Sequence, residues 1–308
     1  MADIVVIGSL NMDLVVRTAR RPQAGETVSG SDFQTIPGGK GANQAVAAAR
    51  CGGRVSMLGR VGQDVFGPAL VENLVRCGVD ATHVHLDAGA PTGTALIVVD
   101  GEGQNSIVVV PGANGHVDRH DVNRLEPLWG RARYLLLQLE VPLPAVSYAV
   151  ETASRHGVRI ILNAAPACPA AGHLLSRVDF LVVNELEAQA LSGVPVTGLE
   201  AAAEAARQLL ARGVPIVILT LGRAGALLAT EAGMHHVPAR KVAAVDTTAA
   251  GDAFIGALAV ALFRSFPLTE AVRYATCAGT LAVTRFGAQT SLPSQAEVEA
   301  FFVGDGGG

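Results

Sequence analysis

Aromatic and charged residues are both scarce in this sequence, at 4% and 16% of its 308 residues. The net charge of -4 argues against nucleic acid or an anionic membrane as the main partner, because both attract strongly basic proteins. No apolar run approaches the roughly 18 residues that span a bilayer. The longest, at 253–263, predicts a buried helix. The N-terminus lacks the basic stretch that opens a signal peptide.

Cysteine is also rare, and its spacing excludes two classes of site. Cys51, Cys77, Cys168 and Cys277 are widely separated, with no CxxC pair and no Cys/His cluster. A disulfide framework or a zinc site is therefore not expected. Small buried thiols suit a reducing compartment, so we expect a cytoplasmic protein.

Short apolar runs alternate with alanine-rich stretches through most of the chain. The runs that predict strands cover residues 3–9, 54–59, 134–139, 159–162, 180–183 and 216–220. The stretches that predict helices between them cover residues 42–50, 68–76, 144–156 and 199–212. Strands that alternate with helices predict a doubly wound α/β fold, with a mostly parallel sheet between two helical layers. We expect one domain over residues 1–308.

Two regions interrupt this alternation with strands that lack helices. They lie within segments at about 12–37 and 91–112, and both are predicted to be antiparallel. The second is a hairpin, in which ALIVVD and SIVVV flank the turn at 101–104. The two segments could pair into a small inserted sheet that acts as a lid over a site at the strand ends. A simple extension of the main sheet is the alternative.

Residues 246–252, Asp-Thr-Thr-Ala-Ala-Gly-Asp, precede the apolar stretch. Ala249, Ala250 and Gly251 are small, and their N–H groups at a helix start would form an anion hole for a phosphoryl group. Asp252 could accept the proton of an attacking hydroxyl, with its carboxylate kept ionised by the neighbouring N–H groups. By itself, the pattern fits an aspartate that only caps a helix equally well.

A glycine cluster, Gly38-Gly39-Lys40-Gly41, opens the helical stretch at 42–50. Glycine lets a sugar or phosphate approach the backbone, Asn43 offers a hydroxyl both a donor and an acceptor, and Lys40 could balance phosphate charge. The GxxxxGK[ST] spacing of a Walker A loop is absent. Alone, the cluster also fits a tight strand-to-helix turn.

Polar residues follow several of the predicted strands. Asn11 and Asp13 come after the first strand, and Glu140 follows the strand at 134–139. Since parallel sheets bind ligands at the carboxyl ends of their strands, these residues suit a polyhydroxyl substrate. Ordinary loop capping is the alternative for each.

Two further elements suit a nucleotide. Asn184 and Glu187, three residues apart after the strand at 180–183, could organise hydrated Mg²⁺ beside phosphates or form a capping box. The segment at 220–225, TLGRAG, could receive nucleotide phosphate or make a hairpin.

Taken together, these segments resemble the ribokinase-like carbohydrate kinase family. Both signatures of that family occur in order, GGKGANQAVAAARCGG running to Gly62 and then DTTAAGDAFIGALA. The similarity extends over essentially the whole chain, from VVIGSLNMD to TRFGAQTSLPS. Because the two signatures lie at opposite ends of the chain, their joint occurrence is highly specific. It favours the catalytic interpretation of each motif.

The resemblance implies a doubly wound α/β domain with a β-sheet lid that also pairs two subunits into a homodimer. It implies transfer of the γ-phosphoryl group of ATP to the 5-hydroxyl of D-ribose, with Mg²⁺ as cofactor and K⁺ as an activating monovalent cation. Asp252 would be the general base, and Ala249, Ala250 and Gly251 the anion hole.

The resemblance also assigns the remaining roles by position. The sugar would be held by Asn11, Asp13, Gly39, Lys40, Asn43, Glu140 and Asp252. The ATP site would be lined by Asn184, Thr220, Gly222, Gly225, Gly251 and Thr276. Asn184 and Glu187 match an NxxE element linked indirectly to Mg²⁺. The K⁺ site would comprise Asp246, Thr248, Ala282, Arg285, Gly287 and Ser291, several of them through backbone carbonyls. Thr276 departs from relatives that carry histidine or asparagine there.

Other functions remain open at this point. Within the same fold, the acceptor could be deoxyribose, fructose or a nucleoside, although a nucleoside base would need an aromatic lid and this lid offers mainly Phe33. A sugar-binding regulator that lost catalysis is disfavoured by the intact Gly251-Asp252. A dinucleotide-dependent oxidoreductase is disfavoured because Gly8-Ser9-Leu10-Asn11 is no GxGxxG motif.

Overall fold

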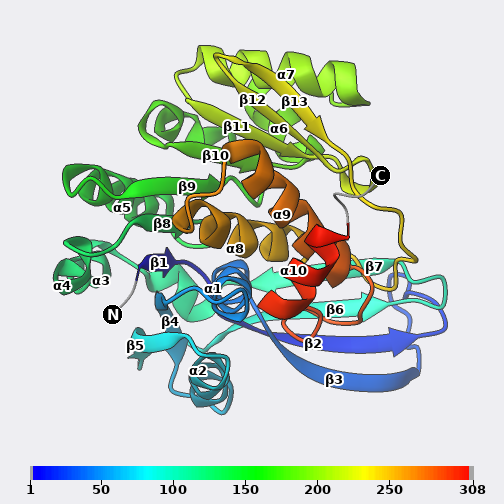
Figure 1. Ribbon diagram of the computed structural model, residues 1–308. Helices are drawn as coiled ribbons and strands as arrows, with labels where there is room; N and C mark the ends of the chain where they lie inside the picture. The colour runs from blue at the N-terminus through cyan, green and yellow to red at the C-terminus, as the bar shows by residue number, and fades with distance from the viewer. Residues whose placement is uncertain (1–2, 305–308) are drawn as a thin grey trace.

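The computed structural model describes residues 3–304 of the chain. Within this range a nine-stranded sheet runs in the order β13-β12-β11-β10-β9-β8-β1-β4-β5 (Figure 1). Its strands are β1 (Ile4–Ile7), β4 (Val55–Gly62), β5 (Asp80–Asp87), β8 (Tyr134–Leu137), β9 (Arg159–Asn163), β10 (Phe180–Val183), β11 (Ile216–Thr220), β12 (Ala226–Thr230) and β13 (Gly233–Val237). The strands from β11 to β5 pair in parallel, whereas β12 and β13 add an antiparallel edge.

Helices cover both faces of this sheet because its strands are apolar on both sides. In β1, Ile4 and Val6 belong to one hydrophobic core, and Val5 and Ile7 belong to the other. The first core is covered by α1 (Lys40–Arg50), α2 (Phe66–Arg76), α8 (Ala250–Phe263), α9 (Leu268–Ala282) and α10 (Gln295–Val303). The second is covered by α3 (Arg119–Asn123), α4 (Glu126–Trp129), α5 (Leu143–Arg155), α6 (Glu185–Ser192) and α7 (Leu199–Ala211). Strands buried on both faces need such a double cover.

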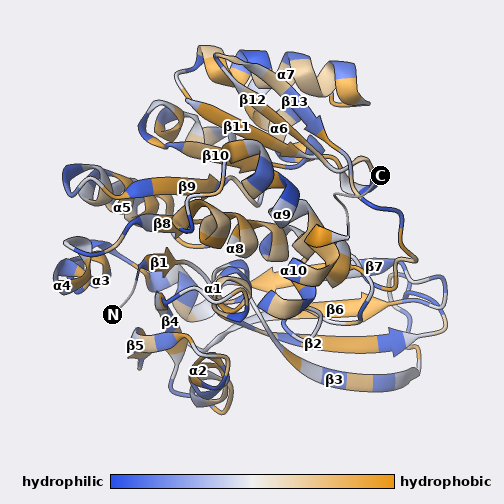
Figure 2. Ribbon diagram, viewed as in Figure 1, coloured by the Kyte–Doolittle hydropathy of each residue, from blue (hydrophilic) through white to orange (hydrophobic). Residues whose placement is uncertain are grey.

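A second, four-stranded sheet projects from one side of the main body (Figure 1). It has the order β3-β2-β6-β7, with β2 (Asn11–Thr18), β3 (Gly30–Gly38), β6 (Gly93–Val99) and β7 (Asn105–Val110). Both predicted segments therefore join one small sheet, whose strands β2 and β6 are strongly apolar in Figure 2. Its role as a lid stays a prediction.

The antiparallel strands predicted within each segment are present in the structure. The two segments join through β2 and β6, which pair in parallel, with Asn11 opposite Gly93. The reason is that each segment forms its own hairpin, and the two hairpins join through their first strands. This pairing between distant segments leaves no local sequence signal.

The strand order reverses at β1, which pairs with β4 on one side and β8 on the other. At such a switch point the carboxyl ends of neighbouring strands leave a crevice for a ligand. The segments after β1, β8, β9, β10 and β11 therefore supply the residues described below. Within residues 3–304 no helix is both long and apolar enough to cross a bilayer.

Candidate active site

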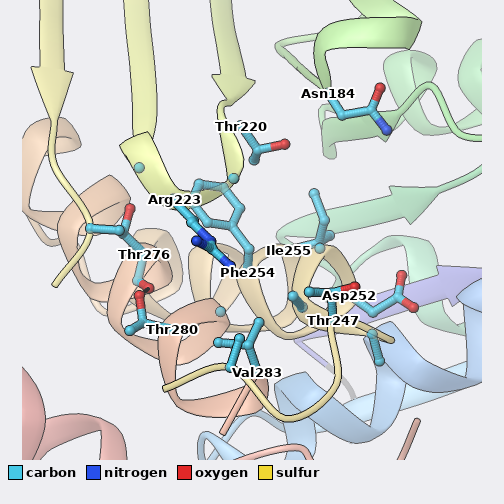
Figure 3. A pocket seen from close by; sticks show the side chains of 18 of the residues that line it. Asn184, Thr220, Arg223, Thr247, Asp252, Phe254, Ile255, Thr276, Thr280 and Val283 are labelled. Carbon is cyan, nitrogen blue, oxygen red and sulfur yellow. Dashed lines mark hydrogen bonds between the residues drawn. The ribbon is translucent and has the colours of Figure 1, made fainter. Parts of the chain in front are cut away.

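A cavity of 1010 Å³ opens where the carboxyl ends of β9, β10 and β11 meet the N-terminus of α8 and one face of α9. Figure 3 shows Asn184 and Asp252 toward one side of it, with Thr276, Thr280 and Val283 toward the other. Predicted site residues that line it are Lys40, Asn184, Glu187, Thr220, Gly222, Gly225, Ala249, Ala250, Gly251, Asp252 and Thr276. One cavity thus collects residues from distant parts of the chain.

The N-terminus of α8 has the geometry expected of an anion hole. Ala249 is its N-cap residue and adopts a left-handed conformation, with φ of 59°. Among residues 3–304, no hydrogen-bond acceptor pairs with the N–H groups of Gly251 and Asp252. These unpaired donors lie at the positive end of the helix dipole, where a phosphoryl group is stabilised. A non-glycine residue in the left-handed region is strained, which is common at functional sites.

The Asp252 carboxylate is buried, and side-chain amides of α1 hold it. Asn43 Nδ2 donates to Asp252 Oδ2 at 2.9 Å, and Gln44 Nε2 donates to Oδ1 at 3.0 Å. We expected N–H groups of its own helix to hold it, and that detail is wrong because they extend along the helix axis. Burial raises the pKa of Asp252, against the opposing effects of Lys40, Gln44 and Asn43.

Further carboxylates and one lysine surround Asp252. Burial raises the pKa of Asp13 to about 7, and the charges of Glu140 and Asp252 add to the effect. Burial lowers the pKa of Lys40, but the carboxylates of Asp252, Glu140 and Glu187 outweigh it, so the net shift is upward. Lys40 therefore stays protonated at the centre of an acidic cluster.

Hydrogen bonds fix the side chains of Glu140 and Asn43. Glu140 Oε2 accepts from Ser9 Oγ at 2.5 Å and from the Lys40 N–H at 3.1 Å. The Oδ1 atom of Asn43 is buried and has no partner within residues 3–304. An unpaired buried acceptor is costly unless a ligand donor satisfies it.

Asn11 lies at the junction between the two sheets. Its Oδ1 atom accepts from Asn114 Nδ2 at 2.8 Å, and Asn114 also bonds both the N–H and the carbonyl of Leu10. Gly39, with φ of 88°, is the N-cap of α1 and follows β3 directly. Asn11, Gly39 and Asn43 therefore sit where the small sheet meets the main body.

Asn184 and Glu187 form a capping box at the start of α6. The Asn184 N–H donates to Glu187 Oε2 at 2.9 Å, and the Glu187 N–H donates to Asn184 Oδ1 at 2.9 Å. A further bond joins Asn184 Nδ2 to Glu187 Oε1 at 3.0 Å. Both residues also line the cavity. Since both Glu187 oxygens already accept hydrogen bonds, this oxygen-rich pair fits Mg²⁺ through water rather than directly.

The far end of the cavity suits a nucleotide. Thr276 Oγ1 donates to the Val272 carbonyl at 2.8 Å, so its donor is already used within α9. Thr220 ends β11, and the turn after it is the short helix η3 (Gly222–Ala224), which leads into β12. Arg223, within the loop predicted at 220–225 but assigned no role of its own, extends into the cavity in Figure 3.

Of the six residues predicted for a monovalent cation, Asp246, Thr248 and Gly287 are joined by hydrogen bonds. Asp246 accepts from the N–H and hydroxyl of Thr248, at 2.9 and 2.6 Å, and from the Gly287 N–H at 2.9 Å. The Arg285 N–H donates to the Ala282 carbonyl at 3.2 Å, and its guanidinium pairs with Glu297. A carboxylate among carbonyls and hydroxyls is a hard oxygen donor set, which fits an alkali cation.

Sequence reasoning missed Gln44, Asn114, Gln138 and Asn163. All four carry amides, and three of them follow or adjoin predicted motifs, as in GGKGANQ and QLE. Only the tertiary structure places Gln44 between Asp252, Gln138 and Asn163. Their bonds join segments far apart in the chain, so the sequence offered no local signal that selects them.

Comparison with known proteins gives a consistent result. Residues 1–295 match the sequence profile described as pfkB family carbohydrate kinase. A ribokinase of Schizosaccharomyces pombe is 43% identical over 313 residues, covering 98% of both chains. A deoxyribokinase of Salmonella typhi is 39% identical over 293 residues, covering 95% of this chain and 96% of the relative. A solved ribokinase of Arabidopsis thaliana complexed with ribose and ATP has a TM-score of 0.90 at 33% identity, over 98% of this chain and 99% of that one. The predicted fold class is confirmed.

Proposed function

Since this chain belongs to the pfkB family of carbohydrate kinases, we propose that it transfers the γ-phosphoryl group of ATP to the 5-hydroxyl of D-ribose. The products are D-ribose 5-phosphate and ADP. The observation that carries the proposal is the buried Asp252 carboxylate at the N-terminus of α8, beside the unpaired N–H groups of Gly251 and itself. Relatives named ribokinase that match nearly the whole chain support the choice of ribose.

The chemistry needs a base, charge neutralisation and positioning. Asp252 accepts the proton of the sugar hydroxyl as that oxygen attacks the γ-phosphorus. Its raised pKa makes it a stronger base than an exposed aspartate. The N–H groups at the α8 N-terminus, from Ala249 to Gly251, stabilise charge on the phosphoryl oxygens, and Lys40 offsets the neighbouring carboxylates.

The sugar binds where the two sheets meet. Asn11, Asp13, Gly39, Lys40, Asn43 and Glu140 surround it, and the carboxylates accept hydrogen bonds from its hydroxyls. The unpartnered Oδ1 of Asn43 accepts another. Two carboxylates and two amides in so small a site favour a polyhydroxyl ligand over an apolar one.

The nucleotide occupies the remainder of the 1010 Å³ cavity, with its base toward Thr276 and its phosphates toward the α8 N-terminus. Asn184, Thr220, Gly222 and Gly225 line its path. Asn184 and Glu187 would help to hold Mg²⁺, which would neutralise phosphate charge. Asp246, Thr248, Ala282, Arg285, Gly287 and Ser291 would hold K⁺, which would stabilise the loop that precedes the anion hole.

The small sheet covers the sugar with one face and pairs with a second copy of the chain through the other. Support comes from exposed apolar residues on the face opposite Asp13, of which Leu96 and Val108 are 46% and 60% exposed. A patch of this kind marks an interaction site.

The four cysteines form no disulfide, which supports a cytoplasmic location.

A coupled assay of ADP release across a panel of acceptors tests the proposed function. D-Ribose should be phosphorylated far faster than fructose or adenosine at equal concentration. A preference for 2-deoxyribose would favour the alternative raised by the deoxyribokinase of Salmonella typhi. Adenosine as the best acceptor would refute the assignment.

A further inference from the structure

A chain of hydrogen-bonded amides adjoins Asp252, and one of its members, Asn163, lines the cavity. Gln44 Nε2 donates to Asp252 Oδ1 at 3.0 Å and to Asn163 Oδ1 at 3.0 Å. Gln138 Nε2 donates to Gln44 Oε1 at 2.6 Å. Gln44 and Gln138 are 0% exposed, and neither lines the cavity. With no exposed surface, neither side chain touches a ligand, so their effect on the reaction passes through the residues that Gln44 holds, Asp252 and Asn163.

The ionised carboxylate fixes the direction of every bond in this chain. A carboxylate only accepts, so Gln44 must present its NH₂ group to Asp252 and its carbonyl to Gln138. Gln138 must then present its own NH₂ group to Gln44. Asn163, which accepts from Gln44, turns its NH₂ group to the Val182 carbonyl at 3.2 Å. Each amide has one orientation that satisfies its neighbours.

The packing around Gln138 shows that this arrangement of amides lowers the stability of the fold. Its Oε1 atom is buried without a hydrogen-bond partner within residues 3–304. A side chain at Gly8 would place its Cβ 2.0 Å from that oxygen, so only glycine leaves room for the amide there. An unsatisfied buried carbonyl is unfavourable for folding. An apolar residue of the same size at 138 would avoid this cost, so stability alone does not explain the glutamine.

We propose that Gln44 is a positioning residue of the phosphoryl transfer, which holds the Asp252 carboxylate in its reactive orientation, and that Gln138 orients Gln44. This inference rests on the proposed function, because it takes Asp252 as the base. Asn43 holds the second carboxylate oxygen, so the two amides of α1 together fix the plane of the carboxylate. Small errors in such an orientation cost about 10²-fold in rate.

The charged groups that face Asp252 are Lys40 from α1, Asp13 from β2, Glu140 after β8 and Glu187 from α6. Their charges act on Asp252 whether or not Gln44 is present. The hydrogen bond from Gln44 lowers the pKa of Asp252 against the effect of burial. Loss of this bond should therefore raise the pKa of Asp252 and move the acid limb of the pH dependence of kcat to higher pH. Loss of packing alone would not cause this shift.

The test is a double-mutant cycle with turnover of ribose and ATP as the readout. Gln44→Met keeps the length of the side chain and removes its amide. With Asp252 intact, we expect kcat to fall about 10- to 100-fold, with the KM for each substrate nearly unchanged. In the Asp252→Asn background the same substitution should change kcat less than about 2-fold, because there is no carboxylate left to orient.

Two further variants complete the experiment. Gln138→Met leaves the bond from Gln44 to Asp252 in place, and should give a smaller loss with the same non-additivity. It carries the test if melting shows that Gln44→Met does not fold. Thr152→Val removes a buried hydroxyl on α5 and is the control for general destabilisation; its kcat and pH profile should match the unmodified protein.

The possible outcomes test the role of Gln44 and the role of Asp252 separately. Equal fold losses in both Asp252 backgrounds, or an unmoved acid limb, would show a structural role for Gln44 and overturn the inference alone. Near-normal turnover of Asp252→Asn by itself would remove Asp252 as the base. That result would overturn the proposed mechanism and the role of Gln44 together.

Discussion

Asp13 offers a test of whether the sugar site is built at the expense of stability. Its carboxyl is 9% exposed, and burial together with Glu140 and Asp252 raises its pKa from 3.8 to about 7. A carboxyl with a raised pKa in the folded state stabilises the fold below its unfolded pKa, and this contribution is lost as pH rises through about 7. The ionised side chain of Asp13 therefore lowers the free energy of unfolding most at alkaline pH.

The magnitude follows from the two pKa values. Since a tenfold change in an ionisation constant corresponds to about 1.4 kcal/mol, the full effect at pH above 8 is about 4 kcal/mol. About 2 kcal/mol of it develops between pH 5.5 and 8.5, because the folded-state group titrates within that window. Asp13→Asn keeps the shape of the side chain and removes the charge, so it abolishes this pH-dependent part.

Thermal unfolding of the ligand-free protein at pH 5.5 and 8.5 measures the effect. Asp13→Asn should raise the melting temperature by several degrees at pH 8.5 and by less at pH 5.5. Asp32→Asn, at an exposed position of β3 in the same small sheet, is the matched control and should change neither value. Ribose affinity should fall in Asp13→Asn, because an acceptor for a sugar hydroxyl is lost.

The reasoning fails if Asp13→Asn changes the melting temperature equally at both pH values. It fails also if the variant is less stable than the unmodified protein at pH 8.5. In the first case the carboxyl would not titrate in this window. In the second its hydrogen bonds would outweigh the cost of its burial.

Three further predictions concern the base, the cation and the small sheet. Asp252→Asn should lower turnover about 10²–10⁴-fold with ATP affinity and melting temperature nearly unchanged. Near-normal turnover would show that Asp252 only caps the helix. A collapse of stability would show that its main role is structural, at the start of the helix. Activity in K⁺ should exceed activity in Na⁺ at matched ionic strength, because the proposed cation site includes Asp246 and Thr248, just before the anion hole. Equal rates would remove that site and leave the kinase assignment standing. Val108→Lys on β7 should give a monomer by light scattering at micromolar concentration, since it places charge in the apolar patch. A fully active, monomeric unmodified protein would contradict the dimer.

Several features of the site could be predicted because their signals are local. The small residues before Asp252 mark the start of α8, and the apolar run after it predicts a buried helix, as found. The capping box of Asn184 and Glu187 was one of two interpretations of their spacing, and the hydrogen bonds at the start of α6 show it. It does not exclude their predicted link to Mg²⁺.

Other features depend on contacts between segments far apart in the chain. The parallel pairing of β2 with β6 joins two hairpins some 80 residues apart, as Asn11 opposite Gly93 shows. The hydrogen bond from Gln44 to Asp252 spans 208 residues, and no local pattern distinguishes this glutamine from others. The raised pKa of Asp252 likewise has no local signal, because burial by the surrounding fold outweighs the effects of Lys40, Gln44 and Asn43.

The sequence alone predicted the family and the strands β1, β4, β8, β9, β10 and β11, because apolar periodicity and short motifs are properties of neighbouring residues. Tertiary structure alone decided which amides hold Asp252, how the two hairpins pair and how far burial shifts the carboxyls of Asp13 and Asp252. These quantities depend on distances and on exclusion of water, which arise only when distant segments pack together.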